Sequence, residues 1–148
     1  MAKDTLGKYV KIFFDESVAG AAREITASMV PNTLAGIGLN YENVDMTGQN
    51  DSLKTGLAGQ ADGTITAQFY LDTTATTGAY TVLEGMEGSE GTLTIQVGTA
   101  DVPASGDPEW EGEYILFGIP ASISAGRFVM TATWRPAPSS TPAWGTVT

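Results

Sequence analysis

The stretch SLKTGLAGQADGTITAQFYLD, residues 52–72, joins two unlike pieces of chain. Apolar and polar side chains alternate from Gly63 onwards, which predicts a half-buried strand over residues 63–72. The preceding residues 48–62 have no such period, and a structureless connection of this length is unusual inside a compact domain. The sequence therefore predicts a two-faced strand preceded by a long loop whose purpose has to be explained.

Further strands are expected where β-branched and aromatic residues recur between turn-forming residues. They fall on these segments: 8–15, 23–31, 36–48, 91–98, 113–119 and 126–134. Loss of the alternation near Glu42 and Asn43 indicates a bulge or bend. Residues 91–98 repeat the two-faced pattern of residues 63–72, so both strands are expected in one sheet.

One short α-helix is expected over residues 76–86, with Thr76 or Thr77 as the N-cap and Gly85 or Gly88 at its end. In total the sequence predicts a mainly β protein, an antiparallel β-sandwich or barrel of about seven strands with one short α-helix and a long inter-strand loop. A single domain over residues 1–135 is followed by a proline-rich tail, residues 136–148. This tail is expected to run extended without forming an element, and the partner of its Trp144 is left open.

Composition argues against most catalytic classes. The 148 residues include no cysteine and no histidine, so thiolate nucleophiles, Cys-ligated zinc and His-dependent acid–base chemistry have no residues to act through. We therefore predict a protein that is not an enzyme and uses no cofactor. No apolar run is long enough for a membrane helix, and the N-terminus lacks the apolar region of a secretory signal.

The formal net charge is −10, from seven basic and seventeen acidic residues, which would repel the phosphate backbone of nucleic acids. The densest group of carboxylates is GDPEWEGEY, with Asp107, Glu109, Glu111 and Glu113. Such a group suits glycoside hydrolysis or calcium binding, but no second catalytic segment and no metal-loop spacing accompany it. A solvated loop is the preferred interpretation, although an extended backbone would set the three glutamates on one face.

Two sets of residues are the candidates for a functional surface. Uncharged polar side chains that alternate with apolar ones are expected to line a lumen, to face another subunit, or to form an ordinary solvent face: Thr64, Thr66, Gln68, Thr92, Thr94 and Gln96. Leu53 and Leu57 lie in the predicted loop, where exposed leucines indicate that a partner covers them.

Residues 41–72 resemble the central region of siphophage tail tube (major tail) proteins. In that family an extended strand ends in a D-x-T-G type corner, and a long loop then leads into an L-x-G-x-x-D/N-G turn and another strand. Asp45, Thr47 and Gly48 match the corner. The turn is matched by Leu57, Gly59, Asp62 and Gly63. The likeness covers roughly residues 5–135.

The resemblance implies a structural virion protein that assembles as stacked hexameric rings into a tail tube. Residues 48–62 would be the stacking loop, with Leu53, Lys54, Leu57 and Gln60 at the ring interface. The implied partners are further copies of the chain, tape measure and tail terminator or tip proteins, and double-stranded DNA that passes without specific binding. The protein would be assembled in the host cytoplasm and would reside in the virion tail.

Two other functions fit the same residues. A capsid head decoration protein would share the β-rich, self-associating character. A carbohydrate-binding β-sandwich would use Trp110, Tyr114 or Trp134 as a stacking platform, unless Trp134 belongs to the core, as its alternating apolar face suggests.

Overall fold

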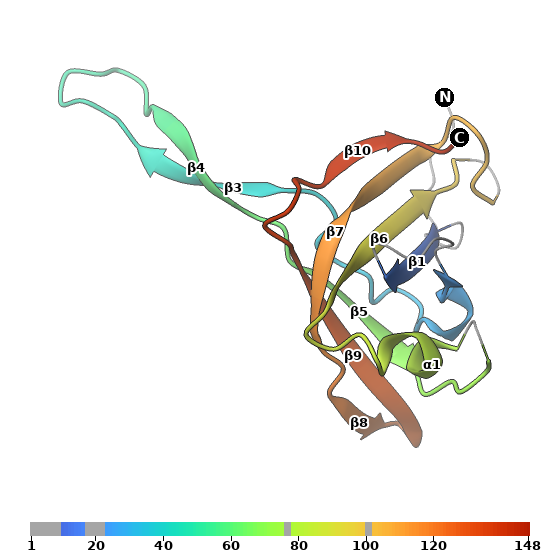
Figure 1. Cartoon of the computed structure of the whole chain (residues 1–148). Coiled ribbons are helices and arrows are strands. Elements are labelled where there is room, and N and C mark those ends of the chain that lie inside the picture. The colour runs from blue at the N-terminus through green and yellow to red at the C-terminus, as the bar shows by residue number, and fades with distance from the viewer. Residues whose placement is uncertain (1–9, 17–22, 76–77, 100–101) are drawn as a thin grey trace.

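The computed structural model describes residues 10–16, 23–75, 78–99 and 102–148 (Figure 1). The described chain is mainly antiparallel β, as predicted, with ten strands rather than about seven. They are β1 (Val10–Glu16), β2 (Arg23–Glu24), β3 (Asn40–Asp45), β4 (Gly56–Asp62), β5 (Ile65–Tyr70), β6 (Glu90–Val97), β7 (Pro108–Gly118), β8 (Ala121–Ser124), β9 (Arg127–Pro136) and β10 (Ala143–Thr146). A 3₁₀ turn, η1 (Thr26–Ser28), and a short helix, α1 (Ala79–Leu83), complete the elements.

Eight strands form one large sheet in the order β2-β1-β6-β7-β9-β5, with β10 paired to β7 and β8 paired to β9. The long β7 pairs with β6 along one edge, and its other edge is shared by β10 and then by β9. Among the described residues the strands do not close into a barrel. Within the described part of the chain, the remaining two strands, β3 and β4, pair only with each other.

The core lies on one face of the large sheet because alternate residues of its strands are apolar. The largest fully buried side chains on these strands include Trp134, Tyr114, Phe14 and Phe69. Trp134 makes edge-on ring contacts with Phe14 and Phe69, at centroid distances of 5.7 and 6.2 Å. Helix α1 covers this face with Ala79, Val82 and Leu83, so the predicted helix against the sheet is confirmed, although it is shorter than residues 76–86. Thr76 and Thr77 lie outside the described residues.

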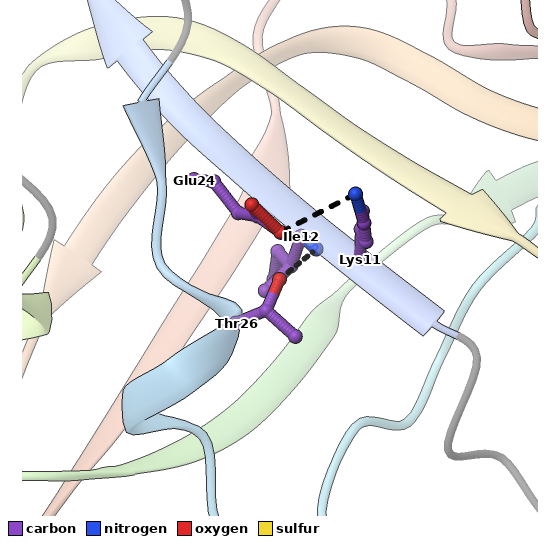
Figure 2. Close-up of polar contacts among 4 residues, drawn as sticks. All are labelled: Lys11, Ile12, Glu24 and Thr26. Carbon is purple, nitrogen blue, oxygen red and sulfur yellow. Dashed lines mark hydrogen bonds and ion pairs between the residues drawn. The ribbon is translucent and has the colours of Figure 1, made fainter. Parts of the chain in front are cut away.

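The segment of residues 23–35 links the two edges of the sheet, pairing with β1 at one edge and with β5 at the other. Figure 2 shows its start, where the Ile12 amide donates to Thr26 Oγ1 at 3.0 Å and Lys11 Nζ lies 4.0 Å from Glu24 Oε1. At the far edge, the Val30 amide donates to the Gln68 carbonyl at 2.8 Å, and Ala35 exchanges two backbone hydrogen bonds with Thr66. The Gln68 amide donates to Thr33 Oγ1 at 3.1 Å, so the outward amides of Thr66 and Gln68 on β5 are both paired within the chain. This pairing lowers the tendency of the edge to join another sheet.

Four sequence predictions are wrong in their bounds. The strand expected over residues 23–31 is only the two-residue β2, because η1 begins at Thr26. Residues 48–62 are not one loop, because their second half is strand β4, and the connecting turn is shorter, between Asp45 and Gly56. The acidic stretch from Pro108 lies in β7 and not in a solvated loop. The proline-rich tail, residues 136–148, is predicted to form no element, but its first residue, Pro136, ends β9 and its residues 143–146 form β10.

Ser28 ties η1 to the start of α1. Its side chain is 2% exposed, its hydroxyl donates to Asp72 Oδ2 at 2.8 Å, and it accepts the amide of buried Ala79 at 3.2 Å. Since the first amides of a helix have no partner within the helix, this hydroxyl satisfies a donor that would otherwise be buried and unpaired.

We therefore expect Ser28→Ala to lower the free energy of unfolding by about 1–3 kcal/mol, the usual cost of leaving a buried polar group unpaired. Chemical denaturation of the monomer measures this change. The matched control Ser105→Ala, in an exposed turn, should stay within about 0.5 kcal/mol of the unmodified protein. Equal stabilities of the two variants would contradict the assigned role of Ser28.

Candidate assembly surfaces

The β3–β4 hairpin stands away from the body as an arm, here defined as residues 40–62 (Figure 1). It joins the body where Gly63 lies so close to Pro136 and Leu39 that a Cβ atom would come within 2.7 and 2.9 Å of their side chains. All six residues of β3 are exposed, and six of the seven in β4 are exposed as well. The predicted bulge is present, since the register shifts between Tyr41 and Asn43.

The arm exposes five large apolar side chains, which is unusual for so small a segment. Their exposed fractions are 55% for Tyr41, 42% for Val44, 55% for Met46, 76% for Leu53 and 59% for Leu57. The register sets Val44 opposite Leu57, and Met46 lies two residues beyond Val44 on the same face. We call Val44, Met46 and Leu57 the apolar face of the arm.

The tip of the arm is ordered by its own hydrogen bonds. The Thr55 amide donates to Thr47 Oγ1 at 2.8 Å, and the Met46 amide donates to the Thr55 carbonyl at 2.9 Å. Gly48 and Asp51 close the turn, with the Gly48 amide donating to Asp51 Oδ2 at 2.6 Å. Of the predicted interface residues, Leu53 and Lys54 lie on this turn, and Leu57 and Gln60 lie on β4, all exposed.

Three Asp-x-Thr turns mark strand ends at Asp45, Asp62 and Asp72. In each, the carboxylate accepts a hydrogen bond from the amide two residues on, at 2.9 Å for Thr47, 3.0 Å for Thr64 and 2.9 Å for Thr74. Such Asx turns hold the backbone where a strand stops. The first was recognised as a corner from the sequence, and the same D-x-T spacing could have identified the other two.

These hydrogen bonds stabilise the ionised carboxylates and lower their pKa values. The threonine hydroxyl is the largest cause for all three aspartates, followed by the threonine amide. The Ser28 hydroxyl lowers the pKa of Asp72 further, and the positive charge of Arg135 does so for Asp62. Thr64, predicted as part of a polar sheet face, is instead engaged in the Asp62 turn, where its hydroxyl donates at 2.8 Å.

The other predicted polar residues do share one face of the large sheet. Thr66 and Gln68 on β5 pair with Thr133 and Thr131 of β9, and the ladders through β7 carry the same face to β6. The β6 residues on it are Thr92, Thr94 and Gln96. We call this surface, opposite the core, the polar face.

The carboxylates of β7 belong to the same polar face. Register pairs Glu113, Glu111 and Glu109 with the three β6 residues, and each pair is hydrogen-bonded. Thr92 Oγ1 donates to Glu113 at 2.8 Å, Thr94 Oγ1 donates to Glu111 at 3.2 Å, and Gln96 Nε2 donates to Glu109 at 2.9 Å. The three glutamates therefore lie in a row on one face, as expected for an extended backbone and not for the solvated loop that the sequence analysis preferred.

The predicted sugar-stacking platform is wrong. Trp110, Tyr114 and Trp134 are 2%, 0% and 0% exposed, so no ring offers a face to a ligand. Trp110 Nε1 donates to the Tyr114 hydroxyl at 2.8 Å inside the core. These aromatic residues stabilise the sheet.

Trp144, whose partner the sequence left open, docks on its own domain. Its ring lies edge-on to Trp110 with centroids 5.2 Å apart, while β10 pairs with the first half of β7. More than half of the side chain, 55%, is still exposed.

The described ranges contain neither a metal-binding cluster nor a membrane-spanning helix. No group of three or more Asp or Glu side chains there has an arrangement that could hold a metal ion. Within the same ranges, no helix has the length and apolarity needed to cross a bilayer.

The fold recurs in solved structures of phage-tail-like particles. A chain from the baseplate of the anti-feeding prophage, in a six-fold symmetrised structure, matches with a TM-score of 0.65 and 13% identity over 98% of this chain and 97% of that one. A chain from the tail of an empty GTA particle of C6 symmetry gives 0.63 and 19%, over 98% and 100%. One from the sheath–tube complex of an extracellular contractile injection system, PVC, gives 0.57 and 12%, over 96% and 92%. No family model and no curated protein matches the sequence.

The Asx turns predict a specific acid response. Because the folded-state pKa values of Asp45, Asp62 and Asp72 lie below the ordinary 3.8, their contribution to stability is complete above that value. It is lost as the pH falls through the lower folded-state values. A carboxyl NMR titration should give midpoints below 3.8 for all three, and Thr74→Val should raise the midpoint of Asp72. Thr73→Val is the control, and an unchanged midpoint in Thr74→Val would contradict the assignment.

Proposed function

We propose that this chain is a structural tail protein that polymerises as stacked rings into a tail tube. The observation that supports it most is the arm, which exposes five large apolar side chains on a hairpin without a second layer. A two-stranded ribbon is at best marginally stable by itself in water. Contact with further copies of the chain would bury the arm and fix it in place.

Hexameric rings are the arrangement that we propose for these contacts. The solved structures of similar fold include six-fold symmetrised and C6 particles, and closed rotational symmetry is the common way in which identical chains complete each other's surfaces. The arm would reach an adjacent ring, with Leu53, Lys54, Leu57 and Gln60 at the stacking interface. Tape measure and terminator or tip proteins would bind the ends of such a tube.

We place the polar face towards the lumen of the tube. Its donors Thr92, Thr94 and Gln96 are already engaged by the β7 glutamates, so they offer little to a passing DNA phosphate. A net charge of −10 per chain gives roughly −60 for about six copies, which would keep the channel from binding double-stranded DNA. The contacts that remain are weak and readily exchanged.

A second candidate is a component of the tube's end. Other structures of similar fold come from the sheath/tube terminator of PVC, at a TM-score of 0.59 and 13% identity, and from the cap of the anti-feeding prophage, at 0.56 and 11%. A tube subunit stacks without limit, whereas an end component stops after one or two rings. Electron microscopy of the concentrated protein separates the two, since only the first gives long hollow rods.

Leu57→Asp should leave the monomer folded and abolish rods, because the side chain is exposed in the monomer but would be buried between copies. Thermal unfolding of the monomer and negative-stain microscopy check the two halves of this prediction. The control is Ser105→Asp, which adds the same charge to an exposed turn outside the arm and should still assemble. Rods formed by Leu57→Asp at normal yield would count against the proposal.

Glu111→Lys tests the orientation of the polar face. It changes the charge by about twelve units per six-membered ring, so tubes of this variant should retain duplex DNA at low salt. Retention should fall on the order of tenfold or more between about 50 and 200 mM salt. Tubes of the unmodified chain should not retain DNA, nor should those of Glu87→Lys, which lies just beyond α1 on the core side of the sheet. Equal behaviour of the two variants would mean that the polar face does not line the lumen.

A further inference from the structure

A second apolar surface lies where β5, β9 and β8 end together. The register pairs Ile123 with Phe128, and the Leu71 amide donates to the Phe128 carbonyl at 3.3 Å. The three side chains therefore stand side by side across the sheet, and we call them the terminal row. Their exposed fractions are 45% for Leu71, 46% for Phe128 and 75% for Ile123.

The terminal row lies on the same apolar face of the sheet as the core, but outside the part of that face that is buried. One step further into the sheet, Phe69 pairs with Met130, and these side chains are 0% and 2% exposed. The terminal row points to the same side of the sheet, because it lies two residues further along each strand. The same apolar surface is thus buried at one position and exposed at the next.

The arm and the terminal row lie at opposite ends of β9. The arm enters the body beside the carboxyl end of this strand, where Ile65 pairs with Trp134 and Gly63 lies against Pro136. The terminal row lies at its amino end, next to the turn between β8 and β9. Ten residues of strand separate the two surfaces by about 30 Å. Figure 1 shows the arm and β8 at opposite ends of the molecule.

We infer that the terminal row of one copy receives the apolar face of the arm of a second copy. Both surfaces are apolar, exposed and small, and one chain cannot bring them together because they lie at its two ends. The two ends also differ in charge. The arm carries four carboxylates and one lysine, a formal charge of −3, whereas the receiving end of the sheet carries Arg127, which precedes Phe128 on β9. The Arg127 side chain points to the other face of β9, where its guanidinium donates a 2.8 Å hydrogen bond to the Tyr70 hydroxyl.

Such a contact joins two different surfaces of identical chains, so each copy can both give and receive an arm and the contact repeats from copy to copy. This inference rests on the proposed function and adds to it the receiving surface for the arm. It assigns to Leu71, Ile123 and Phe128 a role that the sequence did not indicate.

Cysteine cross-linking tests the contact directly, because the chain has no cysteine of its own. Chains carrying Leu57→Cys are mixed with chains carrying Ile123→Cys, allowed to assemble, and oxidised with diamide. A disulfide-linked dimer on a non-reducing gel is the expected product. The matched control replaces the second chain by Ser122→Cys, whose side chain points to the other face of β8, and should give at least about fivefold less dimer.

A single chain that carries both Leu57→Cys and Ile123→Cys should give a ladder of linked oligomers, because each copy then offers both halves of the contact. An internal disulfide alone would overturn the inference, since it would show that the two surfaces meet within one molecule. If rods form but equal amounts of dimer arise from Ile123→Cys and Ser122→Cys, the receiving surface is wrong while the proposed function stands. Absence of any assembly by the unmodified chain would refute both.

Discussion

A two-stranded ribbon cannot bury its own apolar side chains, and the arm is such a ribbon. The arm has a tip ordered by side-chain hydrogen bonds and a base anchored where Gly63 meets Pro136. Between them, Val44 and Leu57 are paired and exposed. The large sheet, by contrast, is covered on its apolar face and paired along the β5 edge by residues 30–35. Eight of the twelve exposed large apolar side chains of the described residues lie in the arm or in the terminal row, and we propose that a second copy covers both.

The sequence was most informative for strands that are buried on one face and exposed on the other. Alternation of Ile65, Ala67 and Phe69 with polar residues reports a strand packed on a core, and the same holds for β6. It failed for β4, GLAGQAD, because a strand exposed on both faces has no reason to alternate and its glycines and alanines have little β propensity. The start of β7 was missed for a related reason, since proline and glutamates usually indicate a loop.

The exposed leucines of the arm and the threonines and glutamines of the polar face could be predicted from the sequence. The residues that lie beside them in the fold could not. The threonines and glutamine of β6 are hydrogen-bonded to the β7 glutamates that lie opposite them. The pattern of a single strand does not reveal which residues of a neighbouring strand lie opposite. Likewise, Leu71, Ile123 and Phe128 come from three separate strands, so only the fold brings them into one row. The sequence does not reveal the partner of Trp144, because Trp110 is distant in sequence and buried.

The central claim is that identical copies cover the arm, and hydrogen–deuterium exchange at increasing protein concentration measures this most directly. The account predicts that amides of residues 40–62 exchange rapidly in dilute protein and become protected as copies associate, while amides of the buried strands change little. Exchange in the arm that is independent of concentration, or already slow in the dilute monomer, would contradict the claim.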